Sequence, residues 1–474
     1  MRTIVCLLRM CLAHWRALTR QNVAVLDVES TGQVNPRSAA VAIPSRDFIP
    51  TRREGRLIEA PPLWRIVTGL KHAVILTLLL TTGLLLAVAQ GPFTDAPTGY
   101  DNLTNGAVTP SAMDAGHGQF IQVEQPIQDG LGPLFNAVSC VDCHQSIADG
   151  GASQVRELRA GHLENGHFVG ATITQGDGVT KVGPRSLIDL RAICTEAIGH
   201  LTPQDNIRAL RLSLSLFGDA FVEAVADADL IAIAQQQIHT THGRVHGEAI
   251  MVPIAEGSGM TVRVGRFGWK DQHASLLSFA SDAYLNEMGV TNPFNQTEVT
   301  TVCNQDNNTP NNTDDIFSFT DFMRGLKAPP QDTALATSTD ARAGEALFNK
   351  IGCATCHVAA LNTVAPGTVL NDGSYTVSAA IGNKTIHPFG DYLLHDIGTG
   401  DGIVQNGPPD TRNKVRTMPL WGIRTRVEFL HDGRAHDLFQ AIRAHENEAD
   451  ASSDQFENLS HEDKAKIIAF LKCL

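Results

Sequence analysis

The sequence has no excess of positive charge and few aromatic residues. Its 37 lysines and arginines are outnumbered by 50 aspartates and glutamates, so the formal net charge is −13. Nucleic-acid binding needs a basic surface that neutralises phosphates, and this balance therefore argues against a nucleic acid as partner. Low-complexity tracts are also absent, and 43% of the 474 residues are hydrophobic. That composition is typical of globular domains, and the length is sufficient for two or three of them.

One uncharged apolar run of 17 residues lies near the N-terminus, AVILTLLLTTGLLLAVA at 73–89. Basic residues precede it and it ends in an A-x-A pattern, which together are typical of a secretory signal. We predict that 63–90 is a signal peptide or, because 17 residues are at the short limit for a span, a membrane anchor. A buried helix of a soluble domain is the remaining alternative. Residues 1–62 are interpreted as a presequence or as a start assigned too early. The mature chain is expected to be exported to the periplasm.

Cysteine is scarce, yet four of the nine cysteines lie in two copies of one pattern, CVDCH at 140–144 and CATCH at 353–357. Zinc would need a second ligand pair at a suitable spacing. A redox dithiol prefers a βαβ context and needs no histidine. Haem c requires this spacing, because two thiols form thioethers with the porphyrin and the next histidine ligates iron. We therefore predict two covalently bound haem c groups, held by Cys140, Cys143, His144, Cys353, Cys356 and His357.

Helical patterns dominate the rest of the chain. An apolar stripe at 343–348 precedes the second motif, and the capping box at 460–463 opens a C-terminal helix. Residues 205–235 also have a helical pattern, whereas 259–267 alternate weakly and indicate a short strand. We expect a mainly α fold of two cytochrome c-like haem domains, the first of them enlarged by insertions with minor β structure.

Composition also suggests where the domains begin and end. Two prolines precede a polar stretch that is typical of a linker. We place the first haem domain at 91–330, the linker at 331–340 and the second haem domain at 341–474.

The chain resembles the di-haem oxidoreductases of the di-haem cytochrome c peroxidase superfamily, in the branch labelled thiol oxidoreductases. The resemblance covers about residues 115–474. It rests on six blocks in order: GLGPLFNAVSCVDCH, VGRFGWKDQHASLLSFASDAYLNEMGVTNP, GEALFNKIGCATCH, HPFGDYLLHDIGTGDGI, RTMPLWGIRTRVEFLHDGR and LFQAIRAHENEA. These blocks specify a family much better than a substrate. The thiol label finds no support, because no dithiol at catalytic spacing remains outside the haem motifs.

The resemblance implies different tasks for the two haems. The C-terminal haem receives electrons and is six-coordinate, whereas the N-terminal haem meets peroxide. His445 matches the position of the sixth ligand of the C-terminal haem. Ligation by His357 and His445 is expected to give a lower potential than His/Met ligation. The alternative for His445 is a polar surface residue on an amphipathic helix.

Two further residues match functional positions of the family. Glu287 matches the distal acid, which would move a proton between the two peroxide oxygens. Trp269 resembles the tryptophan that relays electrons between the haems. The alternatives are a solvated carboxylate and an ordinary core tryptophan. Leu277 occupies the position of the distal glutamine, a departure that argues against ordinary peroxidase turnover.

The sequence leaves three points undecided: calcium, a disulfide and the sixth ligand of the N-terminal haem. The superfamily binds calcium between its domains, but the positions near Arg426 and Glu428 do not keep the usual residues, which leaves calcium undecided. Cys194 and Cys303 could form a disulfide, although no sequence argument fixes their separation. The candidates for a sixth ligand of the N-terminal haem are His162 and, as competitors, His167 and His200.

Two functions from different classes are compatible with these observations. The first is a di-haem oxidoreductase, peroxidase-like, that takes electrons from a small cytochrome or cupredoxin. Its oxidant would be peroxide. Alternatively, its substrate would be a protein side chain that the enzyme oxidises. The second is an electron-transfer cytochrome without enzymatic activity, in which both irons are six-coordinate. A haem-based redox sensor is a weaker third option. An open coordination position at the His144 haem would distinguish the enzyme from the carrier.

Overall fold

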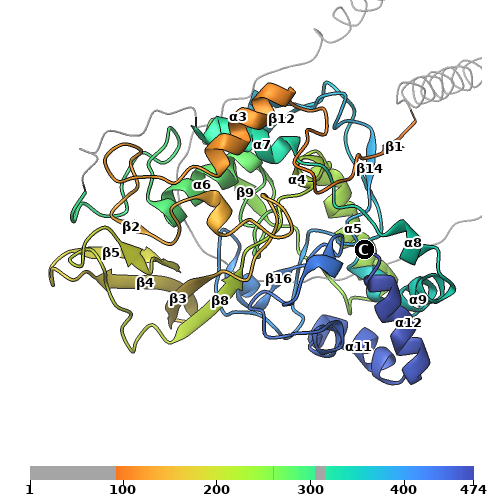
Figure 1. Ribbon diagram of the computed structural model, residues 1–474. Coiled ribbons are helices and arrows are strands. Elements are labelled where there is room, and N and C mark those ends of the chain that lie inside the picture. Colours follow the sequence, from red (N-terminus) through yellow and green to blue (C-terminus); the bar gives the residue numbers. More distant parts are fainter. Residues whose placement is uncertain (1–91, 260, 305–314) are drawn as a thin grey trace, which may run out of the picture. The chain divides into compact units, whose positions relative to one another are not determined.

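Figure 1 shows the computed structural model, which describes residues 92–304 and 315–474 except residue 260. The predicted presequence and the signal peptide or anchor lie outside these residues. Within the described part of the chain, the helices are all too short or too polar to span a membrane. Helices account for 31% of the structure and strands for 19%. The expectation of a mainly α fold is therefore wrong, and one inserted sheet accounts for most of the difference.

Helices dominate the regions around the two motifs. The α-helices are α3 (Pro110–Phe120), α4 (Asp219–Glu223), α5 (Asp227–Thr240), α6 (Leu276–Met288), α7 (Asp315–Gly325), α8 (Thr333–Ala336), α9 (Thr339–Lys350), α10 (Leu438–Arg443), α11 (Asp450–Glu457) and α12 (His461–Leu471). The 3-10 turns are η1 (Cys140–Asp142), η2 (Cys353–Thr355), η3 (Asn371–Gly373), η4 (Pro409–Asn413), η5 (Ile423–Thr425) and η6 (Asn447–Ala449).

Most strands are short and join neighbouring loops. Outside the inserted sheet they are β1 (Thr94–Asp95), β2 (Leu134–Phe135), β7 (Arg191–Ala192), β9 (Met251–Pro253), β10 (Val262–Val264), β11 (Leu361–Asn362), β12 (Val369–Leu370), β13 (Tyr375–Thr376), β14 (Lys384–Ile386), β15 (Leu394–His395) and β16 (Val415–Arg416). β10 pairs with β9 in antiparallel register, which confirms the short strand expected within 259–267.

Two helix crossings support the two motifs in the same way. α9 ends just before the second motif and packs against α12, where a Cβ on Gly344 would lie 2.0 Å from the carbonyl oxygen of Lys466. α3 packs against α7, where a Cβ on Gly116 would lie 2.2 Å from the carbonyl oxygen of Ser318. Only glycine allows such a close approach of two backbones. Ser460 is the N-cap of α12, as the predicted capping box requires, since its hydroxyl accepts a bond from the N–H of Asp463 at 3.1 Å.

An antiparallel sheet follows the first motif and was largely missed by the sequence argument. It contains β5 (Lys181–Arg185), β4 (His167–Thr174), β3 (Arg156–Glu164) and β6 (Leu187–Ile188) in that order, and β8 (Ile207–Leu212) also pairs with β3. β8 occupies part of 205–235, where a helical pattern was expected. The helix there is correct only from Asp219 onward. Pairing with β3 over six residues gives this segment backbone partners that a local pattern does not reveal.

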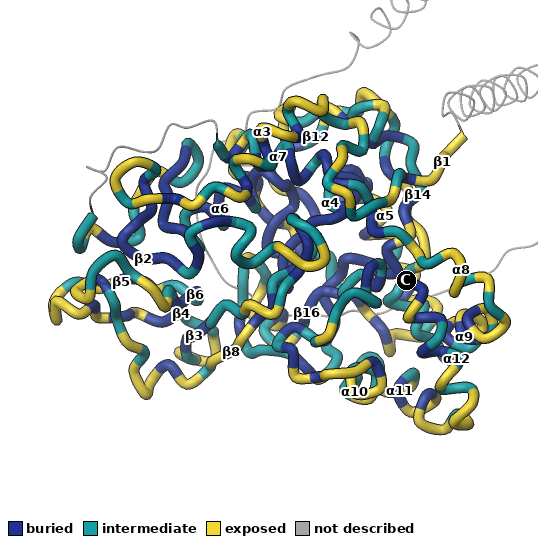
Figure 2. The backbone as a smooth tube through the Cα atoms, in the orientation of Figure 1, coloured by how far each residue is buried: buried dark blue, intermediate teal, exposed yellow. Residues whose placement is uncertain are grey.

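Two hydrophobic cores lie under the motifs. The larger core extends from α3, α6 and α7 to Leu361, Ile386 and Tyr392, so the chain after the second motif returns to pack against the first part. The smaller core surrounds Phe348 and Phe470 at the α9–α12 crossing. Buried backbone is concentrated between these elements, whereas the hairpin turns of the inserted sheet are exposed (Figure 2).

Candidate functional site

Each CxxCH motif folds into a 3-10 turn that brings its histidine close to its cysteines. The N–H of His144 donates to the carbonyl of Cys140 at 3.1 Å, and the N–H of His357 donates to that of Cys353 at 3.0 Å. In each motif the two cysteines and the histidine line one cavity. Attachment of a porphyrin at two thiols and ligation of its iron by the histidine need this arrangement.

The cavity at the second motif has a volume of about 550 Å³ and is mainly apolar. His357 and His445 both line it. The Nδ1–H of His357 donates to the carbonyl of Phe389 at 3.0 Å, and that of His445 donates to the carbonyl of Ala441 at 2.7 Å. A carbonyl can only accept, so each ring keeps an unprotonated Nε2, the form that binds metals. Burial lowers the pKa of both imidazoles, that of His357 to about 4, which keeps them neutral.

The cavity at the first motif has a volume of about 170 Å³. The Nδ1–H of His144 donates to the carbonyl of Leu214 at 2.7 Å, and burial lowers the pKa of this imidazole. Among the described residues, His144 is the only histidine lining this cavity. The two cavities therefore differ, because four histidines (His357, His395, His431 and His445) line the second and, among the described residues, one lines the first.

Burial raises the pKa of Cys140, Cys143 and Cys353 to about 12, so these thiols are uncharged. The donor set of each cavity, two neutral thiols and a neutral imidazole around an apolar space, fits a haem.

A carboxylate–histidine cluster lies beside the second motif and was not found from the sequence. His395 Nε2 is 2.9 Å from Asp391 and its Nδ1 is 2.9 Å from Glu448. Cys356 Sγ, Asp391 and His395 are close enough together to suggest a metal site. Although burial opposes it, the two carboxylates and Cys356 raise the pKa of His395 well above its usual value. Both ring nitrogens of His395 have a carboxylate partner, so the cluster forms a buried ion network.

Trp269 lies in the walls of both cavities. Its Nε1–H donates to the carbonyl of Leu212 at 2.8 Å, and its ring meets the ring of His431 edge-on at 6.1 Å between centroids. The side chain is 6% exposed. The position between the cavities is the one that the resemblance implied for an electron relay.

Glu287, near the end of α6, lines the first cavity. Its Oε2 accepts a bond from the side-chain amide of Asn136 at 3.0 Å, and its backbone carbonyl accepts from the N–H of the same residue at 2.7 Å. Burial and the neighbouring Glu157 raise the pKa of Glu287 well above its usual range. It is therefore not a solvated surface carboxylate. Leu277 belongs to the hydrophobic core.

The remaining histidine candidates lie elsewhere. His162 is on β3, with Nδ1 3.4 Å from Asp205, and none of the three candidates is among the residues described as lining the first cavity. Their placement offers no second imidazole to His144.

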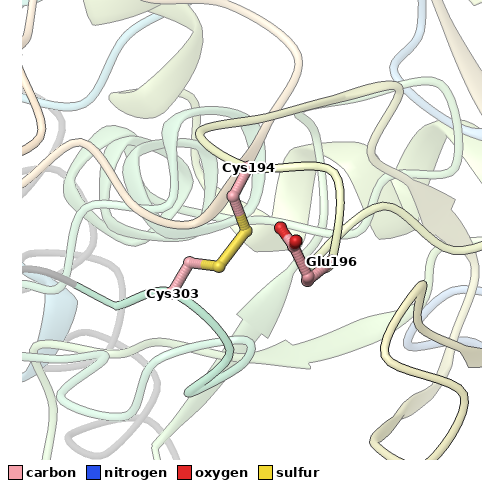
Figure 3. Close-up of side chains that lie close together, drawn as sticks. All are labelled: Cys194, Glu196 and Cys303. Carbon is pink, nitrogen blue, oxygen red and sulfur yellow. A yellow bond between two sulfur atoms is a disulfide. The ribbon is translucent and has the colours of Figure 1, made fainter.

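Cys194 and Cys303 form a disulfide that links the end of β7 to the loop before α7 (Figure 3). Glu196 lies beside it and completes a group resembling a metal site, but the bonded sulfurs are not available as thiolates. The pairing left open by the sequence is thus decided by the fold. Cys473 is buried, and its thiol donates to the carbonyl of Phe470.

The residues around Arg426 do not fit calcium. Glu428 is paired with Arg156 at 2.7 Å, and Arg426 is a guanidinium whose pKa burial and the nearby Arg416 lower to about 10. Calcium needs six to eight oxygen ligands, whereas a guanidinium only donates and carries the same sign of charge.

An internal ammonium lies next to Trp269. Lys270 Nζ donates to the carbonyls of Thr411 at 2.9 Å, Arg412 at 3.0 Å and Lys414, and lies 3.4 Å from Asp401. Burial lowers the pKa of this lysine to about 8. The carbonyl-lined space is therefore filled by a cation of the chain itself.

Comparison with protein families matches residues 193–474, more than half of the chain, to the family described as "Di-haem oxidoreductase, putative peroxidase". No curated protein matches the sequence. Among solved structures, Kuenenia stuttgartiensis hydrazine synthase aligns with 13% identity and a TM-score of 0.37, over 81% of this chain and 90% of that chain. A MauG-like protein associated with microbial copper homeostasis aligns with 16% identity and a TM-score of 0.37, over 81% and 93%. Both structures are too distant to bear on the function.

Proposed function

The chain belongs to the di-haem oxidoreductase family, and from this premise we propose that it is an exported, peroxidase-like enzyme with two covalently bound haem c groups. His357 and His445 would hold the haem that receives electrons, Trp269 would lie on the path between the two sites, and His144 would hold the haem at which peroxide is reduced. When bound, the haems supply one-electron transfer and an iron that coordinates peroxide. The proposed donor is a small periplasmic cytochrome or cupredoxin. An oxidisable protein side chain is the alternative substrate.

The difference between the two cavities carries this proposal. Two neutral imidazoles, His357 and His445, face the larger cavity, which supports a saturated, electron-transferring iron. The smaller cavity is lined, among the described residues, by His144 and by carboxyl groups, without a second imidazole. An iron held there by His144 would keep a position for a small oxidant, as direct binding of peroxide to iron would require.

Glu287 contributes a proton to this chemistry. Reduction of one peroxide to two waters takes two electrons and two protons, and the leaving oxygen must be protonated as the O–O bond breaks. The raised pKa of Glu287 favours the protonated form of its carboxyl, which could supply this proton.

Electron paramagnetic resonance of the ferric di-haem protein tests the proposal, before and after half-reduction. We expect a high-spin signal from the His144 haem beside a low-spin bis-histidine signal, and a change of the first on adding cyanide. Low-spin signals alone, unchanged by half-reduction, cyanide or peroxide, would mean an electron carrier without a catalytic iron.

Substitution of His445 by methionine tests the proposed ligation. We expect His445→Met to raise the midpoint potential of the C-terminal haem by on the order of 0.1 V, since thioether sulfur favours ferrous iron. The measurement is a spectroelectrochemical titration of both haems. His436→Met, at an exposed histidine of the same segment, is the control and is expected to leave both potentials unchanged. An unchanged potential in His445→Met would exclude His445 as the ligand.

A further inference from the structure

A second carboxyl group, Glu157, reaches the first cavity from the inserted sheet. It lies on β3, and Arg159, two residues on and therefore on the same face of the strand, lines the cavity as well. Glu157 and Glu287 hydrogen-bond to each other through their side chains. The inserted sheet and α6 thus meet at the cavity of His144 through two carboxyl groups.

A hydrogen bond between two carboxyl groups requires a proton. An ionised carboxylate has only acceptors, so two ionised groups could not form this bond. Two negative charges in contact would also repel strongly in a partly buried site. The pair of Glu157 and Glu287 therefore holds one proton and one negative charge.

The surroundings assign the charge and the proton to different members of the pair. Arg159 donates to both oxygens of Glu157, at 2.7 and 2.9 Å, and Arg211 lies 3.8 Å from the same group. Glu287 receives one bond from the neutral amide of Asn136. A bidentate guanidinium favours the ionised form. Although burial acts in the opposite direction, Arg159 and Arg211 lower the pKa of Glu157, whereas burial and Glu157 raise that of Glu287.

The remaining charges near the pair act mainly on its arginines. Arg211 is held by Asp401 at 2.6 Å, and its side chain is 1% exposed. The titratable or charged groups that line the cavity with the pair are Cys140, Cys143, His144, Arg156, Arg159, Arg211, Asp282 and Tyr284. Asp282 is bonded to His273, and Asp189 and Asp401 act through arginines, so Glu157 is the carboxyl group that acts directly on Glu287.

We propose that Glu157 is a positioning residue for Glu287: the two share one proton, and Glu157 carries the charge that holds Glu287 as the proton donor of the cavity. This inference rests on the proposed function for its catalytic meaning, whereas the shared proton rests on the meeting of the two carboxyl groups in one cavity and on the bidentate bond of Arg159 to Glu157. The polar partner of the distal acid then comes from the inserted sheet, instead of from the helix position that Leu277 occupies.

Infrared spectroscopy of the di-haem protein tests the shared proton without any turnover. The band measured is the carbonyl stretch of the protonated carboxyl, followed over pH. Burial raises the pKa of other carboxyls as well, among them Glu124 and Asp219, each to about 7. The Glu287 band is therefore isolated by subtracting the spectrum of Glu287→Gln. Glu164→Gln, at an exposed position of the same strand, serves as the matched control.

We expect a protonated Glu287 at neutral pH in the wild type and in Glu164→Gln. In Glu157→Gln the midpoint pH of this band should fall, because the negative neighbour is gone and Arg159 turns its charge on Glu287. Glu157→Asp keeps a negative charge beside Arg159 but moves it away from Glu287. It should therefore also lower the midpoint pH, and it replaces Glu157→Gln if that variant does not fold. An unchanged midpoint in both variants would overturn the inference.

The peroxide assay separates this inference from the proposed function. A shifted midpoint in a wild-type background that does not reduce peroxide would leave the shared proton correct and the peroxidase proposal wrong. Normal peroxide turnover with an unchanged midpoint would support the peroxidase proposal and overturn the shared proton.

Discussion

Replacing Cys353 and Cys356 together by alanine is expected to leave the chain with one covalently bound haem instead of two. The two thiols line the larger cavity beside His357, and each thioether depends on one of them. With both removed, a porphyrin in that cavity is held only by its iron ligands and is lost on denaturation. The measurement is the haem content of the denatured protein, by mass and by absorbance of the pyridine complex.

Two other variants make the result specific. The pair Cys140→Ala/Cys143→Ala should remove the other haem and leave the low-spin bis-histidine signal in place. Cys473→Ala changes a buried cysteine outside the motifs and should keep both haems. Two haems retained after denaturation in the Cys353/Cys356 variant would contradict covalent attachment at the second motif.

Glu287→Gln is expected to lower the rate of peroxide reduction by about 100-fold, the usual size of a general-acid contribution. Glutamine keeps the shape of the side chain and its bond to Asn136 but cannot give up a proton. Since the protonated form exists below the raised pKa of Glu287, the wild-type rate should hold at every pH below that pKa. The rate should fall as the pH rises through that pKa, whereas the rate of Glu287→Gln should show no such fall.

The control for this prediction is again Glu164→Gln, with wild-type turnover expected. Both variants must carry two haems and show the wild-type resonance spectrum, so that the rate alone changes. Wild-type turnover in Glu287→Gln would remove Glu287 from the proton path, and another group would have to supply the proton.

The sequence by itself determined the parts that depend on neighbouring residues. Each CxxCH motif closes a turn within five residues, so the grouping of cysteines and histidine needs no other part of the chain. The capping serine and apolar spacing of α12 are likewise local, and the structure contains that helix. The family followed from blocks of sequence whose order and content need no folded structure to be recognised.

The tertiary structure decided whatever depends on distant contacts. β3 and β8 are 46 or more residues apart along the chain at every paired position, and their pairing contributes to the sheet that made the mainly α expectation wrong. The disulfide spans 109 residues, and the bond from Asn136 to Glu287 spans 151. In both pairs, the residues that surround one partner in the sequence do not indicate where the other partner lies. Glu157 has no local mark of its role, because an acidic residue in a strand becomes significant only when folding brings a second carboxyl against it.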